Sequence, residues 1–170
     1  RKDITSRMSG SGFQTRLIWY VISLGINGGI EELYSKMKII EIAENIARKA
    51  HQGQYRKDGI TPYITHPERV ADRLSTDTDA QTVAWLHDVL EDTGVSEASL
   101  IAAGIAENIV LAVTLLTKSD GIDYEDYLIK VRDNDLALKV KIEDMLDNLL
   151  DSPTKKQIVK YARGLLILLS

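Results

Sequence analysis

Apolar residues recur at three- and four-residue steps along most of this chain, and this spacing constrains the fold more than any other feature of the sequence. The first clear run starts at Met37, and its members share one face of a helix: Ile39, Ile42, Ala43, Ile46, Ala47 and Ala50. Leu, Ile and Ala supply most of the apolar content, whereas aromatic residues make up only 6% of the chain. That balance favours helices over sheets, so the sequence predicts an all-α fold.

Turn-forming residues divide the chain after Ala50 into further helices. Gln52-Gly53-Gln54 ends the first helix, and a polar loop over residues 55–65 follows. The segment from Thr65 to Glu68 has the pattern of a capping box with proline in the first turn, which predicts a helix starting at His66. The remaining helices are predicted at about 79–91, 96–103, 105–117, 123–132, 134–150 and 154–169.

Residues 1–36 differ in character from the rest of the chain. They contain a Ser/Gly cluster at 9–12 and a Gly pair at 28–29, and they lack a clear helical period. Two interpretations stay open: an N-terminal extension that is not native and lies upstream of a natural start at Met37, or an accessory hairpin that packs the apolar residues 18–21 on the core. No repeat or linker divides residues 37–170, which we expect to form one domain.

Composition excludes several classes of function. The chain has no cysteine, which rules out disulfides, thiolate metal sites and cysteine nucleophiles and suits a cytoplasmic location. A net charge of −4 gives no overall basic field to attract a nucleic-acid polymer or an acidic membrane. The longest apolar run, residues 17–24, is too short to span a bilayer. Because thiolates are missing, any bound metal must be held by imidazole and carboxylate groups. The sequence leaves the oligomeric state open.

The strongest chemical signal is a cluster of four polar residues, His87, Asp88, Glu91 and Asp92. On a continuous helix, residues four apart lie on the same side, so these groups would gather opposite an apolar face. Like charges in such a cluster repel each other unless a cation is bound between them. A chance His-Asp pair on a solvated face is the alternative. The apolar flanks favour a divalent metal site.

A second acidic cluster lies farther along the chain, where Asp144 and Asn148 are four residues apart on a predicted helix. Taken alone, this pattern is typical of a solvated helix face. Beside the first cluster, it offers a further metal ligand.

The chain resembles the hydrolase domain of RelA/SpoT proteins and of the small alarmone hydrolases, with the resemblance extending over about residues 37–165. Five pieces carry it in the family's order: Ala50-His51-Gln52-Gly53-Gln54, Arg56-Lys57-Asp58-Gly59, Pro62-Tyr63-Ile64-Thr65-His66-Pro67, Leu86-His87-Asp88-Val89-Leu90-Glu91-Asp92-Thr93 and Lys141-Ile142-Glu143-Asp144-Met145-Leu146-Asp147-Asn148. The resemblance implies a single HD-domain helical bundle, at residues 37–170, with a metal site between helices.

The resemblance also implies a set of metal ligands, namely His66, His87, Asp88 and Asp144. Two imidazoles and two carboxylates suit one divalent ion, Mn²⁺ first, with Zn²⁺ or Fe²⁺ also compatible. His51 corresponds to a histidine that supports the neighbouring loop, so we expect it to stay outside the metal site. With only two histidines left, a two-metal site is not expected.

The remaining site residues follow from the same resemblance. Glu91 and Asp92 correspond to the pair that positions and deprotonates the attacking water. The residues expected to bind substrate are Arg56, Lys57, Lys118, Asn148 and Tyr161. Solvent exposure is the alternative for Lys118, as it is for Lys139 and Lys141. Tyr63 and Trp85 are expected to pack in the loop and the core.

The predicted function is hydrolysis of the 3′-pyrophosphate of guanosine-3′,5′-bis(diphosphate) or a related nucleotide by a metal-dependent phosphoric ester hydrolase. Met145 and Asp147 stand where the alarmone enzymes usually carry a basic residue and a His or Tyr, so we expect the nucleotide end of the pocket to differ. One alternative is a broader nucleotidase or phosphomonoesterase. Another is a nucleotide-sensing module without turnover, against which the water-activating pair argues.

Overall fold

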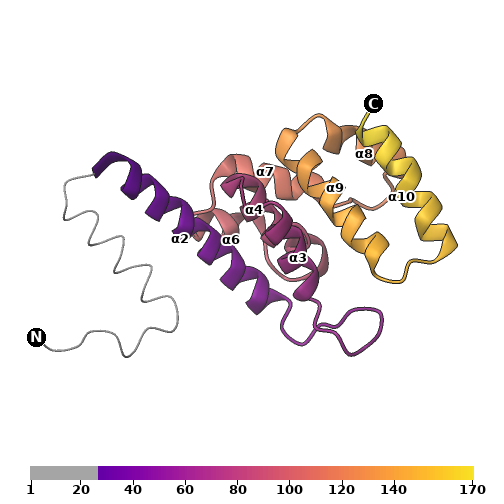
Figure 1. Cartoon of the computed structure of the whole chain (residues 1–170), viewed down its shortest axis with the longest axis horizontal. Coiled ribbons are helices and arrows are strands. Elements are labelled where there is room, and N and C mark those ends of the chain that lie inside the picture. Colours follow the sequence, from indigo (N-terminus) through magenta and orange to yellow (C-terminus); the bar gives the residue numbers. More distant parts are fainter. Residues whose placement is uncertain (1–26) are drawn as a thin grey trace, which may run out of the picture. The chain divides into compact units, whose positions relative to one another are not determined.

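A computed structural model describes residues 27–170, in which helices alternate with short loops (Figure 1). Residues Ile39–Ser170 form one compact unit, which contains all the predicted site residues. The hairpin considered for residues 18–21 lies outside the described residues. The helices are α2 (Asn27–Ala50), α3 (Thr65–Arg73), α4 (Thr78–Leu86), α5 (Val89–Asp92), α6 (Glu97–Ala102), α7 (Glu107–Leu116), α8 (Tyr124–Arg132), α9 (Asp135–Leu150) and α10 (Lys155–Leu168).

The all-α prediction is confirmed for this part of the chain. From residue 27 onward, the β-type pairing is limited to an isolated antiparallel bridge between Tyr55 and Pro62 in the loop after α2. Side chains cap most of the later helices by accepting a backbone N–H of the first turn: Asp77 for α4, Ser96 for α6, Asp123 for α8, Asn134 for α9 and Thr154 for α10. These caps satisfy backbone donors that a helix start leaves unpaired.

One predicted helix is wrong near the site. The helix expected over 79–91 ends at Leu86, and a turn at His87 and Asp88 separates it from the single turn of α5. At this turn the His87 Nδ1–H donates to the carbonyl of Ala84 at 2.7 Å, so a side chain supplies a partner at the C-terminal end of α4. The apolar spacing that predicts one helix therefore continues through His87 and Asp88, although these two residues are not helical.

The capping box expected at the start of α3 is also absent. The helix begins at Thr65 after Ile64, whose side chain cannot cap. The Thr65 hydroxyl instead donates to the carbonyl of Pro62 at 2.8 Å. The first described helix, α2, begins at Asn27, ahead of Met37, where the sequence pattern places the start of the helical run.

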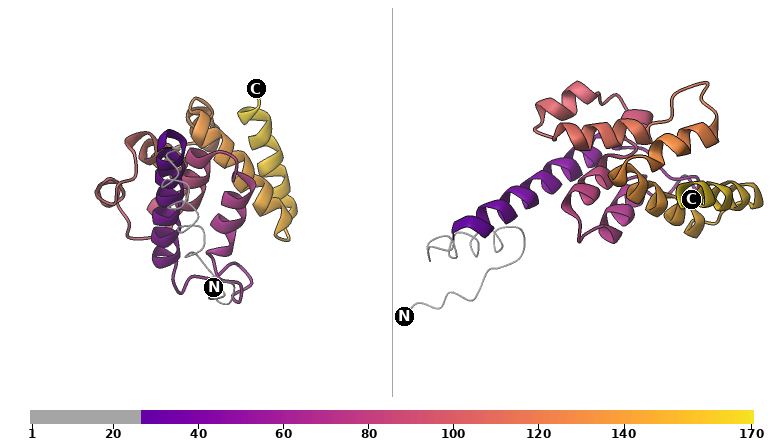
Figure 2. Two further views of the ribbon diagram at one scale, coloured as in Figure 1. Left: turned by 60° about the vertical axis from the view of Figure 1, so that its left-hand side comes forward. Right: turned by 90° about the horizontal axis from the view of Figure 1, so that it is seen from above.

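Helix α9 lies at the centre of the unit and contacts α3, α4, α7, α8 and α10. Both views in Figure 2 show α9 and α10 side by side. The face of α9 that points into the unit carries Ala137, Val140 and Met145, which are fully buried, and also Asp144 and Asp147. Two acids within a buried face are costly unless they are paired. They therefore mark where the unit holds polar groups.

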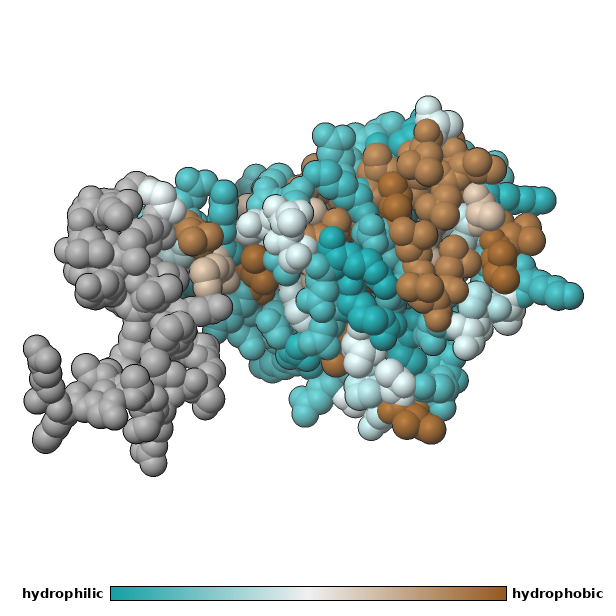
Figure 3. Space-filling model, in the orientation of Figure 1, coloured by the Kyte–Doolittle hydropathy of each residue, from teal (hydrophilic) through white to brown (hydrophobic). Residues whose placement is uncertain are grey.

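Several aliphatic side chains remain exposed on the outer side of α9 and α10, where Figure 3 shows a hydrophobic area. They are Leu146, Leu150, Ile158, Leu166 and Leu169. None of the helices described between residues 27 and 170 combines the length and hydropathy needed to cross a membrane.

Candidate metal centre

Three elements bring the four predicted metal ligands together. His66 lies in the first turn of α3, His87 and Asp88 form the turn between α4 and α5, and Asp144 lies in the middle of α9. The two imidazoles and Asp144 are buried, with at most 6% of each residue exposed, and Asp88 is half-buried. The centre is thus a nearly closed site between helices.

The donor atoms of these residues converge. His66 Nε2 lies 3.2 Å from His87 Nε2 and 3.1 Å from Asp144 Oδ1. Asp88 Oδ2 lies 3.1 Å from His87 Nε2 and 3.7 Å from His66 Nε2. Ligand atoms about 2.1 Å from one ion would lie about 3.0–3.5 Å apart. His66, His87 and Asp144 thus offer atoms within 4.8 Å of one another, and Asp88 joins them through both imidazoles.

Hydrogen bonds on the outer ring nitrogens leave both Nε2 atoms available to an ion. His87 Nδ1 faces the carbonyl of Ala84, which can only accept, so Nδ1 carries the proton. His66 Nδ1 lies 2.7 Å from Asp147 Oδ2, a carboxylate oxygen that also accepts from arginine. In the neutral rings, two Nε2 lone pairs therefore face each other and two carboxylates. This donor set fits a divalent cation.

The carboxylates of the centre shift the pKa of their neighbours strongly. Burial lowers the pKa of His87, but the carboxylates of Asp88 and Asp144 outweigh it and raise that pKa to about 9. Burial alone would raise the pKa of Asp144, but the ammonium of Lys141, which donates to Asp144 Oδ2 at 2.9 Å, and the two imidazoles outweigh burial and hold that pKa well below its usual value. The two carboxylates thus favour positive charge at this buried centre, which Lys141 supplies in part.

Asp147 supports His66 from behind, which the sequence did not reveal. Its side chain is 1% exposed and accepts from His66 Nδ1, from Arg69 Nε and Nη2 at 2.8 Å, and from Arg73 Nη2 at 3.0 Å. Its carboxylate points at His66, and the expected difference at the nucleotide end of the pocket stays a prediction. The sequence holds one sign of this cluster, because His66, Arg69 and Arg73 recur with helical spacing on one face of α3.

The two predicted water-activating residues follow on the exposed turn of α5. Glu91 Oε2 accepts from the backbone N–H of Lys118 at 3.1 Å. The backbone carbonyl of Asp92 accepts from Gln54 Nε2 at 3.0 Å. Both side chains are solvent-exposed, and neither belongs to the buried group of donor atoms around His66.

The predicted substrate residues are brought together only in part. Arg56 donates to Asp151 at 2.7 Å and to Asn148 Oδ1 at 3.3 Å, and Asn148 Nδ2 in turn donates to Asp144 Oδ1 at 2.6 Å. Tyr161 is half-buried, and Asp144 is the strongest of the nearby charges that raise its pKa, after burial itself. Lys57 is exposed on the loop, apart from this group.

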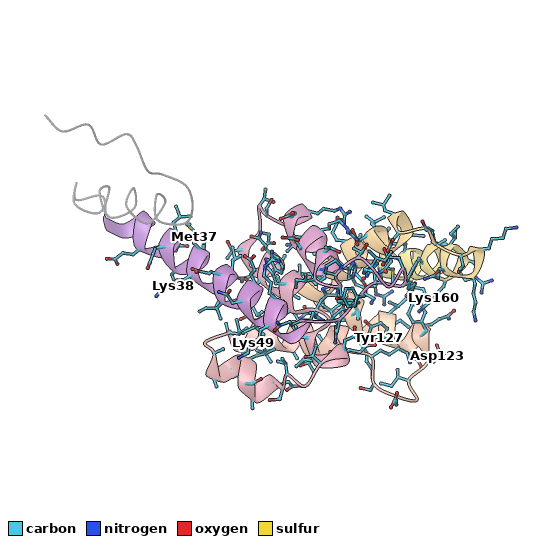
Figure 4. The ribbon with its side chains drawn as sticks, turned by 90° about the horizontal axis from the view of Figure 1, so that it is seen from below. Met37, Lys38, Lys49, Asp123, Tyr127 and Lys160 are labelled. Atoms are coloured by element: carbon cyan, nitrogen blue, oxygen red, sulfur yellow. The ribbon has the colours of Figure 1, made fainter. Side chains whose placement is uncertain are left out.

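Two lysines border the same region. The backbone N–H of Lys118 donates to Glu91. Burial and the charge of Lys141 lower the pKa of Lys160, and the charge of Lys118 lowers it further. The Lys160 ammonium lies 4.3 Å from the centre of the Tyr124 ring and 5.7 Å from that of Tyr161. Figure 4 shows Lys160, Tyr127 and Asp123 at the same end of the unit. Lys160 was not among the residues predicted from the sequence.

His51 stays outside the group of donor atoms. Its Nδ1 lies 2.7 Å from Gln54 Oε1, and its ring packs on Tyr63 with a centroid separation of 4.8 Å. Among the described residues, the acids and imidazoles that could jointly hold an ion do not include it.

Known proteins resemble this chain in sequence and in fold. It is 48% identical over 79 residues to a guanosine-3′,5′-bis(diphosphate) 3′-pyrophosphohydrolase of Haemophilus influenzae. The aligned stretch covers 43% of this chain and 11% of that protein. It is 43% identical over 68 residues to the bifunctional (p)ppGpp synthase/hydrolase RelA of Mycobacterium tuberculosis, covering 37% of this chain and 9% of that protein. The chain thus matches about a tenth of the length of these relatives.

A solved structure has a similar fold. It is described as a metazoan ortholog of SpoT that hydrolyzes ppGpp and plays a role in starvation responses. The TM-score is 0.64 at 24% sequence identity, covering 76% of this chain and 83% of the other. The HD domain family matches residues 43–150, which include all four converging residues. Because this match covers more than half of the sequence, the chain belongs to the HD domain family.

Proposed function

We propose that residues 37–170 form an HD hydrolase domain that removes the 3′-pyrophosphate of guanosine-3′,5′-bis(diphosphate) or a closely related nucleotide. Water is the second substrate, and the products are pyrophosphate and a nucleotide with a free 3′-hydroxyl. Relatives in sequence carry this activity in their names, and the HD domain family matches residues 43–150 of this chain. We place the reaction in the cytoplasm, in keeping with the absence of cysteine.

The observation that carries the proposal is the pair of Nε2 lone pairs held face to face between two carboxylates. The outer nitrogens of His66 and His87 are already engaged by Asp147 and Ala84, so the inner ones serve an ion without a change of tautomer. A bound divalent ion polarises a phosphoryl oxygen and lowers the pKa of a water molecule. The mixed nitrogen and oxygen donors support Mn²⁺ as the native metal, with Zn²⁺ or Fe²⁺ as substitutes.

The proton-transfer roles go to the acids of α5. Glu91 and Asp92 are solvent-exposed one turn after Asp88, so they can exchange protons with water while the buried ligands cannot. We assign the general-base role to Glu91 and a water-orienting role to Asp92. The hydrogen bond from the Lys118 backbone leaves the second oxygen of Glu91 free to accept a proton.

The basic residues around the centre suit a substrate with several phosphates. Arg56, Lys118 and Lys141 come from different parts of the chain, and the net charge of the protein is negative, so the positive charge is local. Arg56 and Lys57 are assigned to the base and phosphates, Lys118 to a phosphate, Asn148 to the sugar and Tyr161 to the nucleotide. Arg56 must exchange its partner Asp151 for substrate.

The test is a substrate comparison with purified protein and Mn²⁺. We expect equimolar pyrophosphate and GDP from guanosine-3′,5′-bis(diphosphate), and loss of turnover on chelation. Nucleoside monophosphates and p-nitrophenyl phosphate serve as competitors, with orthophosphate measured separately. Faster release of orthophosphate from monoesters would favour a broad phosphomonoesterase. Tight nucleotide binding without any product would instead favour a sensing module.

A further inference from the structure

Tyr63 makes a contact that its place in a polar loop does not suggest. Its hydroxyl donates to Asp88 Oδ2 at 2.6 Å. This is the same oxygen that lies 3.1 Å from His87 Nε2 and 3.7 Å from His66 Nε2. The tyrosine therefore holds the carboxylate atom that faces both imidazoles, whereas the sequence predicts only that Tyr63 packs in its loop.

Toward Asp88 the Tyr63 hydroxyl is the hydrogen-bond donor, because an ionised carboxylate can only accept. A fixed donor next to Asp88 selects one orientation of that carboxylate.

The ring of Tyr63 connects this donor to the loop that precedes α3. One face packs on His51, which in turn bonds Gln54 at 2.7 Å. The guanidinium of Arg56 lies 5.6 Å from the ring centre. The backbone N–H of Tyr63 donates to the carbonyl of Gln54 at 2.9 Å. The ring is thus held by the same loop that carries Arg56.

We propose that Tyr63 is a positioning residue that orients Asp88 Oδ2 toward the metal and links this ligand to the Arg56 loop. The inference rests on the proposed metal-dependent function, but it concerns metal affinity, which can be measured without turnover. Hydrogen-bonded partners of metal ligands fix ligand orientation, and their loss typically weakens metal binding or activity by about 10- to 100-fold.

The experiment compares Tyr63→Phe with Tyr55→Phe in the full chain. Both substitutions remove one hydroxyl from the same loop, but Tyr55 is 57% exposed and has no contact with the centre. Apo protein is titrated with Mn²⁺ by calorimetry and with Co²⁺ by visible absorption, which reports ligand number and geometry. Thermal unfolding of each apo variant checks the fold.

We expect Tyr63→Phe to bind Mn²⁺ about 10-fold or more weakly and to change the Co²⁺ spectrum, while Tyr55→Phe matches the wild type. At saturating Mn²⁺, Tyr63→Phe should lower kcat with little change in KM. Wild-type affinity and an unchanged Co²⁺ spectrum in Tyr63→Phe would overturn the inference. An intact metal titration without turnover on any nucleotide would overturn the proposed substrate and leave the role of Tyr63 standing.

Discussion

Each histidine of the centre divides its two ring nitrogens between the protein and an ion. The Nδ1 atoms of His66 and His87 have strong acceptors at 2.7 Å, a carboxylate in one case and a backbone carbonyl in the other. The partner of His66 is a charged carboxylate, which also accepts from Arg69 and Arg73, whereas the partner of His87 is a neutral carbonyl. The two imidazoles are therefore not equivalent.

Replacing Asp147 by Asn tests this difference. The amide keeps the shape but loses the charge that His66, Arg69 and Arg73 share, so His66 becomes a weaker and less well oriented ligand. We expect Asp147→Asn to weaken Mn²⁺ binding by about 10- to 100-fold in calorimetry. Glu143→Gln is the control on the same helix, since Glu143 forms a long ion pair with Arg73, at 3.9 Å, and is not among the residues that could jointly hold an ion in the described part of the chain. Equal affinities of the two variants would contradict a supporting role for Asp147.

Glu91→Gln and Asp88→Asn should separate proton transfer from metal binding. A glutamine still accepts from the Lys118 backbone but cannot take a proton from water, so turnover should fall roughly 10²- to 10⁴-fold with metal content unchanged. Asp88→Asn should lose metal and activity together, because its oxygen faces both imidazoles. Bound metal and turnover are measured side by side. Comparable metal loss in Glu91→Gln would show that Glu91 is itself a ligand.

The sequence was informative about residues that carry motifs and uninformative about their partners. The family resemblance implied His66, His87, Asp88 and Asp144 as ligands, and the structure brings them together. Asp147 and Tyr63 were missed because their importance depends on which residue lies opposite them, and those partners are 81 and 25 positions away. Helical spacing predicts neighbours within one helix only.

Among the elements, the break between α4 and α5 shows where helical periodicity misleads. Apolar residues continue at helical spacing from Val83 through Val89, and both ends are fully buried. The backbone nevertheless turns at His87 and Asp88, where polar side chains supply hydrogen bonds that replace helical ones. A continuous helix would place Asp88 differently relative to His66. The local break thus serves the site.

Helix α10 approaches its neighbours closely at Gly164. A Cβ at this position would lie 3.0 Å from Met145 Cε and 3.1 Å from Leu128 Cδ1. We expect Gly164→Val to lower the free energy of unfolding by about 1–3 kcal/mol through overpacking. Ala162→Val, on the exposed side of the same helix, should cost only a few tenths of a kcal/mol through helix propensity. Urea denaturation compares the two, and equal losses would rule out a packing effect.

The whole unit depends on contacts between segments that are distant in the sequence. The centre draws on the loop before α3, the turn after α4 and the middle of α9, and α9 contacts each of the helices concerned. Helix content followed from apolar periodicity, whereas the pairing of helices did not, because many amphipathic faces are interchangeable by composition. The family resemblance supplied the arrangement that periodicity could not.

The extent of the folding unit can be tested by truncation. Deleting residues 1–36 should leave the melting temperature and the Mn²⁺ affinity essentially unchanged. The described side chains that this removes from α2 are exposed or half-exposed, and the Glu32–Lys36 ion pair is on the surface, where such pairs contribute little.

Deleting residues 1–46 is the matched control, because it also removes Ala43, which is fully buried, and half-buried side chains such as Ile39 that pack against the core. Loss of this apolar contact should lower the melting temperature by several degrees, since about 1 kcal/mol already shifts it by roughly 2–8 °C. Differential scanning calorimetry of the two truncated proteins and the full chain makes the comparison. A large drop for the shorter deletion would mean that residues 1–36 contribute to the core, as an accessory hairpin would. If both deletions left the melting temperature unchanged, the buried part of α2 would add little to stability.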